Sequence, residues 1–231
     1  MTGMLVRLML KLVRGKDITV ARELSPFAVL GHVLQKGLIP CIRGTLAKAF
    51  LGRTKGMFFL GRGCRILSRG QLSAGKNLYI GDYSYIDCLS TGGVNIGDNV
   101  TIREGCWLQL TSRYDNPGTS ITIGDSVYIG PRATLGAAAP LSIGDRTQIG
   151  ANVSFIAENH EFGGAGEIFG QGVNRKGISI GRDVWIGNNV VILDGVSVGE
   201  GTVIGAGTVV TKSPPARSVA VGVPGRVVRT R

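Results

Sequence analysis

Isoleucine or valine recurs at every sixth position of residues 178–211. These residues are Ile180, Ile186, Ile192, Val198, Ile204 and Val210, and a second, mostly β-branched set lies two residues before each of them. An α-helix repeats its apolar positions every 3.6 residues and a half-buried strand every two. A period of six predicts short strands that turn at fixed intervals and point one side chain each into a shared core. The predicted fold class is therefore all-β, a parallel β-helix of hexapeptide repeats.

The tripeptide Ile/Val-Gly-acid marks expected strand ends in much of the chain. It begins at Ile80, Ile96, Ile123, Ile143 and Val198, and Ile180-Gly181-Arg182 is a variant. Three six-residue sides form a triangular coil of 18 residues, which is the spacing from Ile180 to Val198. The other spacings are 16, 27, 20 and 37 residues. Because extra residues cannot enter a stacked core, we expect loops near residues 111–119 and 157–176.

Composition agrees with one solenoid that carries appendages. The chain has 231 residues and 37 glycines, and glycine suits the corners of such a fold. We expect a basic, helical N-terminal segment at 1–56, the β-helix at 57–213 and a short C-terminal tail at 214–231. The four cysteines are widely spaced and form no CxxC pair, which is typical of packing residues in a reducing compartment.

The net positive charge of the chain lies in the first 70 residues, because Lys and Arg equal Asp and Glu in number over the rest. The first 70 residues contain 13 Lys and Arg against only Asp17 and Glu23, and no acid occurs from Leu24 to Gly81. Residues 1–16 can form a helix with basic and apolar faces, as in segments that bind a membrane surface. A solvated helical cap on the end of the solenoid is the alternative. No motif or set of stacking aromatics indicates nucleic-acid binding, so none is predicted.

No part of the sequence predicts a membrane span or a cleaved signal. The first 16 residues are too short and too basic to span, and no later apolar run reaches the roughly 18–20 residues that a span needs. The small-residue cleavage site of a signal peptide is also missing from the N-terminal segment. We therefore expect a cytoplasmic protein, with peripheral contact between residues 1–70 and the inner membrane face as one interpretation of the charge.

The two histidines lie in different settings. His32 is in the apolar stretch 27–34, where a packed or capping role is expected. His160 lies in Glu158-Asn159-His160-Glu161-Phe162, at the root of the longest interruption of the repeat. An imidazole gains and loses a proton near neutral pH, so a loop histidine at this place is a candidate general base.

Several motifs together resemble a known family. They are His160-Glu161-Phe162, Gln171-Gly172, Lys176 to Gly181, Val184 to Gly187, Gly205 to Gly207, Thr211-Lys212 and the ending Gly222 to Arg229. Over approximately Ile80 to Arg229 the chain resembles the hexapeptide-repeat acyltransferases, which include galactoside, maltose and xenobiotic O-acetyltransferases. Within them it is most similar to O-acetyltransferases of bacterial surface-polysaccharide biosynthesis.

This resemblance implies a left-handed β-helix and a homotrimer with active sites between subunits. It implies acetyl-CoA as the acyl donor and no metal. His160 matches the family base, which removes a proton from the acceptor hydroxyl or amine. Glu158, Glu161 or a backbone carbonyl remain candidates to orient its imidazole.

The resemblance also assigns seven residues to acetyl-CoA. Trp185 would shape the pocket near the acetyl group, while Asn188 and Ala206 match contacts to the thioester or the pantetheine arm. Thr211 and Lys212 match the CoA-contact pair at the end of the last coil. Arg226 and Arg229 match tail positions near the nucleotide phosphates, where guanidinium groups can bind two oxygens each.

The predicted function is acetyl-CoA-dependent O-acetylation of a sugar hydroxyl on a cell-envelope polysaccharide or its lipid-linked precursor. The alternative within acyltransferases is N-acetylation of an amino-sugar nucleotide. A non-enzymatic β-solenoid is a further alternative. A γ-type carbonic anhydrase shares the fold but needs three histidine ligands, and His160 is alone in the predicted solenoid.

Overall fold

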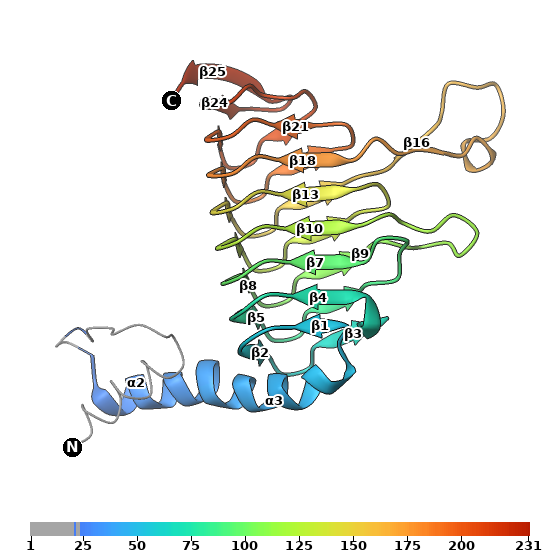
Figure 1. Ribbon diagram of the computed structural model, residues 1–231. Coiled ribbons are helices and arrows are strands. Elements are labelled where there is room, and N and C mark those ends of the chain that lie inside the picture. Colours follow the sequence, from blue (N-terminus) through green and yellow to red (C-terminus); the bar gives the residue numbers. More distant parts are fainter. Residues whose placement is uncertain (1–20, 22–23) are drawn as a thin grey trace.

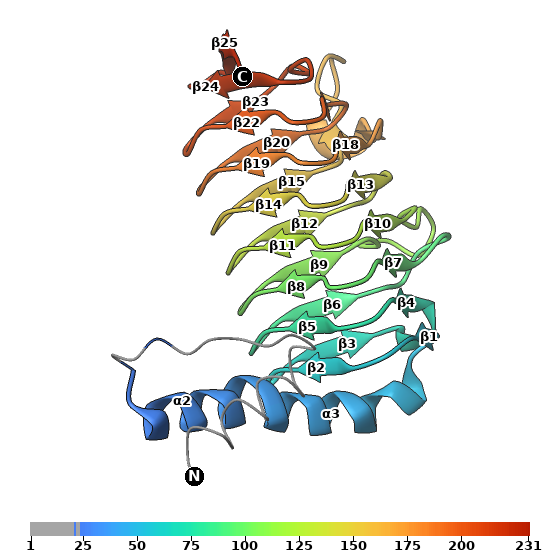
Figure 2. The same cartoon turned by 60° about the vertical axis from the view of Figure 1, so that its left-hand side comes forward.

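The computed structural model describes residue 21 and residues 24–231 (Figure 1). The helix expected over residues 1–16 lies outside the described residues. Three parallel sheets form a solenoid, and a helical segment lies across its N-terminal end (Figures 1 and 2). Within residues 24–231, no helix is long and apolar enough to cross a membrane.

Each turn of the chain adds one strand to each sheet. Sheet A contains β1 (Arg53–Thr54), β4 (Leu72–Ala74), β7 (Val94–Ile96), β10 (Ile121–Ile123), β13 (Leu141–Ile143), β18 (Ile178–Ile180) and β21 (Ser197–Val198). Sheet B contains β2 (Phe58–Leu60), β5 (Leu78–Ile80), β8 (Thr101–Ile102), β11 (Tyr128–Ile129), β14 (Gln148–Ile149), β19 (Trp185–Ile186), β22 (Val203–Ile204), β24 (Ser218–Val221) and β25 (Arg226–Thr230). Sheet C contains β3 (Arg65–Leu67), β6 (Tyr85–Asp87), β9 (Trp107–Gln109), β12 (Thr134–Gly136), β15 (Ser154–Ile156), β20 (Val191–Leu193) and β23 (Val209–Val210).

These strands confirm the predicted left-handed parallel β-helix of hexapeptide repeats. We count coils from the first, β1–β3, to the seventh, β21–β23. Within sheet B, β24 pairs parallel with β22, and β25 then returns antiparallel to β24. The six residues of the Ile/Val period are all at most 3% exposed, so they form the core as predicted.

Close contact between coils explains the Ile/Val-Gly-acid motif. A Cβ atom on Gly97 would lie 2.3 Å from Oδ1 of Asp125 in the next coil, so only glycine allows that approach. The Asp125 carboxylate in turn accepts a hydrogen bond of 2.7 Å from the backbone N–H of Asp98. Asp98 and Asp145 cap the preceding corner in the same way. The acid of the motif therefore satisfies a backbone donor of the preceding coil.

One interpretation of the spacing is wrong. Ile80 belongs to sheet B, where it pairs with Ile102, and the sheet A partner of Ile96 is Ala74. The 16-residue spacing from Ile80 to Ile96 therefore joins corners of two different sheets and is not the length of a coil. The sequence Ala74-Gly75-Lys76 has neither the isoleucine nor the acid of the motif, so the same tripeptide at the next corner was matched instead.

The N-terminal helix is continuous but contains a wide turn. It runs through α2 (Pro26–Val33), the π-helical turn η1 (Leu34–Leu38), α3 (Ile39–Ala47) and the 3₁₀ turn η2 (Lys48–Phe50). Pro40 has no N–H, and its ring crowds the carbonyl four residues earlier. The N–H of Ile39 reaches the carbonyl of Leu34 in a π-type bond, which accommodates the proline without ending the helix.

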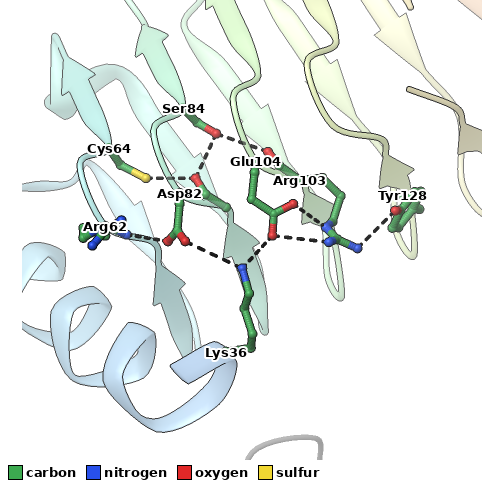
Figure 3. A network of polar contacts seen from close by, with 9 residues as sticks. Lys36, Arg62, Cys64, Asp82, Ser84, Arg103, Glu104 and Tyr128 are labelled. Atoms are coloured by element: carbon green, nitrogen blue, oxygen red, sulfur yellow. Dashed lines mark hydrogen bonds and ion pairs between the residues drawn. The ribbon is translucent and has the colours of Figure 1, made fainter. Parts of the chain in front are cut away.

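Lys36, in this π-helical turn, connects the helix to the second and third coils (Figure 3). Its Nζ lies 2.9 Å from Oε1 of Glu104 and 3.6 Å from Oδ2 of Asp82. Arg103 binds the second oxygen of Glu104 at 2.9 Å and donates to the hydroxyl of Tyr128. Burial alone would raise the pKa of Glu104, but the hydrogen bonds from Arg103 and Lys36 lower that pKa to about 2.

The glycines of the helix give a test of its packing. A Cβ on Gly44 would lie 1.8 Å from the carbonyl oxygen of Phe58 in β2, whereas a Cβ on Gly31 would meet nothing within 4 Å. We expect Gly44→Ala to displace α3 from β2 and to lower the free energy of unfolding by about 2 kcal/mol. Gly31→Ala should leave it unchanged or raise it by up to about 1 kcal/mol. Denaturant unfolding measures both, and equal effects would contradict this packing.

Glu104 gives a pH-dependent test. Its folded pKa lies below its ordinary value of 4.5, so its contribution to stability is present above pH 4.5 and is lost as pH falls toward 2. We expect Glu104→Gln to cost about 1–2 kcal/mol at pH 7, allowing for partial exposure to solvent. The difference from the unmodified protein should shrink between pH 4.5 and 2.

The control for Glu104 is Glu200→Gln. Glu200 pairs with Arg182 at 2.8 Å, but both side chains are largely exposed. Glu200→Gln should cost less stability at pH 7 than Glu104→Gln when both variants are followed by denaturant unfolding. A cost for Glu104→Gln that stays constant from pH 7 to 2 would argue against the ion pairs as the cause.

Candidate active site

His160 lies on a hairpin that leaves the solenoid between the fifth and sixth coils. Strand β16 (Asn159–His160) pairs antiparallel with β17 (Val173–Asn174), and His160 lies opposite Val173. The 3₁₀ turn η4 (Ile168–Gly170) lies between these two strands. Figure 1 shows this segment projecting from the solenoid, and the His160 side chain is exposed.

Arg175 holds the hairpin to the other long loop. Its Nε lies 2.6 Å from Oε2 of Glu158, and its Nη1 donates to Oδ1 of Asn116 at 2.8 Å. The same Nη1 also donates to the carbonyls of Asn116 and Pro117. The Arg175 side chain is only 17% exposed. A largely buried guanidinium that binds both the hairpin and the 111–119 loop restricts the conformations of the hairpin base.

The returning end of the hairpin is fixed by Asp194. The backbone N–H groups of Lys176 and Gly177 both donate to this carboxylate, at 2.9 and 2.7 Å. Asp194 follows β20 in the sixth coil, so this end is anchored directly to the solenoid. The hairpin therefore has braced ends and an exposed tip.

The structure places the two candidate orienting acids differently. The Glu158 carboxylate binds Arg175 and so braces the base of the hairpin. Glu161 is exposed, and its backbone N–H donates to the carbonyl of Gly172. His32 is exposed in the last turn of α2, so of the two roles expected for it, packed or capping, the packed role is wrong.

Three of the predicted CoA-contact residues lie in the sixth and seventh coils. Trp185 points outward from β19 and is 60% exposed, between Gln148 and Val203 in the sheet register. Asn188 and Ala206 occupy equivalent corners of successive coils. Oδ1 of Asn188 accepts a 2.8 Å hydrogen bond from the N–H of Ala151, so this side chain also has a structural role.

The remaining candidates lie at the C-terminal end. Lys212 and Arg226 line one pocket of about 240 Å³, together with Ser213, Pro214 and Val227. Thr211 follows β23 and is exposed. Arg229 lies in β25 opposite Val219, and its side chain is also exposed. A larger, open groove of about 520 Å³ on sheet A contains none of the predicted site residues.

One chain therefore brings some candidates together and separates others. Lys212 and Arg226 share a pocket, and Asn188 and Ala206 are stacked. The His160 hairpin leaves at the corner between sheets C and A, whereas Asn188 lies at the corner between sheets B and C. His160, the predicted base, and this part of the predicted donor site are thus at opposite ends of the sheet C strands.

Comparison with known proteins agrees with this architecture. Residues 177–212 match the family described as bacterial transferase hexapeptide (six repeats). The matched residues span the sixth and seventh coils of the solenoid. This matched segment contains Trp185, Asn188, Ala206, Thr211 and Lys212.

Solved structures with this fold include acyltransferases. The S84C mutant of AntD, an N-acyltransferase from Bacillus cereus in complex with dTDP-4-amino-4,6-dideoxyglucose and coenzyme A, is 21% identical with a TM-score of 0.58. That match covers 82% of this chain and 88% of the AntD chain. A maltose O-acetyltransferase from Clostridium difficile is also 21% identical, with a TM-score of 0.46, and the match covers 99% of this chain and 83% of the other.

Sequence reasoning did not find Arg175 or Asn116. Neither belongs to a repeat position, and their 59-residue separation gives no local signal of contact. The acid Glu158 followed by Arg175 across the insertion was the only available indication of a pair. Their contact depends on how two irregular loops fold against each other.

Arg175 gives a test of how the hairpin is held. We expect Arg175→Met to increase amide exchange of residues 158–175 about tenfold, because Glu158 and Asn116 lose their shared donor. The solenoid strands should keep their protection. Arg113→Met is the matched control, because Arg113 pairs with Asp115 in the other loop with both side chains exposed. Hydrogen–deuterium exchange with mass spectrometry distinguishes the two, and unchanged exchange in Arg175→Met would contradict the bracing role.

Proposed function

We propose that this protein transfers an acetyl group from acetyl-CoA to a sugar hydroxyl, with His160 as the general base. The observation that carries the proposal is the exposed imidazole on a hairpin braced at both ends. A catalytic base must be held within reach of its substrate while its nitrogen stays accessible. Arg175 and Asp194 satisfy the first requirement, and the exposure of His160 satisfies the second.

The proposed donor site includes Trp185, Asn188, Ala206, Thr211, Lys212, Arg226 and Arg229. The likeness of fold to AntD, which was crystallised with coenzyme A, supports acetyl-CoA as the donor. Lys212 and Arg226 line one pocket, where two cations suit the phosphates of a nucleotide. The exposed indole of Trp185 supplies an apolar surface for the acyl end.

The proposed reaction is a direct transfer. The imidazole of His160 takes the proton of the acceptor hydroxyl as its oxygen attacks the thioester carbonyl. The tetrahedral intermediate collapses, the carbon–sulfur bond breaks, and the thiolate of CoA leaves. The imidazolium then returns the proton to that thiolate, so the products are an acetyl ester and CoA.

We propose a homotrimer in which neighbouring subunits complete the site. In one chain the His160 hairpin and the corner of Asn188 lie at opposite ends of the sheet C strands. A neighbouring solenoid packed alongside could place its donor residues next to this hairpin. Closed cyclic symmetry repeats such a contact around the assembly.

The proposed acceptor is a cell-envelope polysaccharide or its lipid-linked precursor, modified at the cytoplasmic face of the membrane. The concentration of positive charge in residues 1–70 supports contact with an anionic membrane surface. The alternative is N-acylation of an amino-sugar nucleotide. The likeness to AntD, an N-acyltransferase solved with a dTDP-linked amino sugar, favours that alternative.

The test of the base is His160→Ala. We expect acetyl transfer to fall about 10²–10⁴-fold while CoA affinity and oligomeric state stay unchanged, because only proton removal is lost. His32→Ala is the matched control, since His32 is also exposed but lies in α2. Radiolabelled acetyl transfer, CoA titration and light scattering are the measurements. Turnover close to that of the unmodified protein would rule out His160 as the base.

The same assay can distinguish the acceptors. Labelled acetyl-CoA is offered with polyprenyl-linked glycans in one reaction and with dTDP-linked amino sugars in another. Alkali-labile label on the glycan indicates an O-acetyl ester, whereas alkali-stable label on the amino sugar indicates an amide. The second result would replace the proposed acceptor with the alternative.

A further inference from the structure

The helix from Pro26 to Phe50 has an apolar face that no described part of the chain covers. Phe27, Ile39, Ile42, Leu46 and Phe50 form this outer stripe, and they are between 41% and 75% exposed. Single exposed apolar side chains are common on proteins, but an aligned set marks an interaction surface. The outer stripe therefore requires an explanation that the acyl-transfer site does not give.

The opposite face of the helix is already occupied. Val33, Gly37, Pro40 and Gly44 are buried and follow each other at intervals of four, three and four residues. Gly44 lies against the carbonyl of Phe58 in β2. Because these intervals keep residues on one side of a helix, this face packs on the solenoid and the outer stripe points away from it. At 1.5 Å per residue the helix is about 37 Å long.

None of the five residues of the outer stripe is charged, but Arg43 borders them, because it lies four residues after Ile39 and three before Leu46. The three Lys and Arg residues of the helix are Lys36, Arg43 and Lys48. Lys36 binds Glu104, and Lys48 donates to the carbonyl of Gly56. Arg43 has a long aliphatic stem, so its guanidinium can extend to the head groups while the stripe beside it enters the apolar phase.

Positive charge surrounds this end of the solenoid. The first coil and the turn that follows it carry Arg53, Lys55, Arg62, Arg65 and Arg69, all exposed. Figures 1 and 2 show the helix lying against this end of the stack. No acid occurs between Leu24 and Gly81, so neither the helix nor the first coil contributes a negative charge. An apolar stripe next to exposed cations fits a partner that has an anionic surface and an apolar interior.

We infer that the outer stripe inserts into an anionic lipid surface, with the cations of the first coil at the level of the head groups. This inference deepens the membrane contact within the proposed function, and it does not depend on acyl transfer. Amphipathic helices bind such surfaces by burying an apolar face at the boundary between head groups and acyl chains. A second copy of the chain fits less well, because two basic ends would repel each other.

The test uses the full chain and its Ile42→Gln/Leu46→Gln variant. Vesicles of phosphatidylcholine with phosphatidylglycerol at 3:1 are compared with phosphatidylcholine alone by co-sedimentation. We expect the unmodified protein to bind the anionic vesicles at least tenfold more tightly, and less tightly at higher salt. The double variant should lose at least tenfold in affinity for the anionic vesicles. Both substitutions are at exposed positions, and a thermal melt checks that the fold is retained.

Tyr114→Gln/Val228→Gln is the matched control. These side chains are similarly exposed, at 89% and 59%, but lie away from the helix. Its vesicle affinity should stay within twofold of that of the unmodified protein. Equal vesicle binding by the unmodified protein and the helix variant would overturn the inference. Self-association that the helix variant abolishes, without vesicle binding, would overturn it in favour of a second copy.

The result of the vesicle-binding experiment does not depend on the proposed acetyl transfer. Vesicle binding is measured without acetyl-CoA or acceptor. Loss of acetyl transfer in His160→Ala with retained vesicle binding would support both proposals. Normal vesicle binding by a protein with no acetyltransferase activity would refute the proposed function and leave the membrane inference standing.

Discussion

The contact between successive coils is the constraint on which the rest of the structure depends. Backbone strands stack in register, and at most corners that follow a strand of sheet A or sheet B a glycine lets the next coil approach to a distance that a Cβ would prevent. An aspartate of the next coil then caps the exposed N–H, as Asp125 does for Asp98. Since nothing can be inserted into such a stack, every irregular segment leaves it sideways. The His160 hairpin and the 111–119 loop both do so, and Arg175 connects them.

The regular part of this fold could be predicted because its information is local and repeated. Ile180 and its successors recur every six residues because each faces the same core, and all are buried. The coil containing Ala74 was misread because its corner lacks the isoleucine and the acid, although it stacks like the others. The contacts of Arg175 have no period and join loops 59 residues apart, so no sequence pattern contained them.

The helix shows a second limit of sequence reasoning. Its apolar residues lie on more than one side, and hydrophobicity alone favours burial of Ile42, Leu46 and Phe50. The structure instead buries the side with Gly37, Pro40 and Gly44, because small residues let the helix backbone approach β2. Close packing therefore decided which face was covered, and the larger side chains remained outside. Membrane contact was predicted for the basic residues 1–70. The lipid-binding surface proposed from the structure consists of the helix over residues 26–50 and the first coil.

The two proposals together constrain the acceptor. The helix lies at the first coil, whereas the His160 hairpin leaves after the fifth. At about 4.8 Å between stacked strands, the four spacings from the first coil to the fifth separate the proposed lipid surface from His160 by roughly 20 Å when the solenoid axis stands normal to the membrane. A sugar attached directly to a lipid carrier would remain near the head groups and would not reach His160. An acceptor several sugars long would reach it, so membrane attachment at the first coil favours a lipid-linked glycan over a lipid-linked monosaccharide.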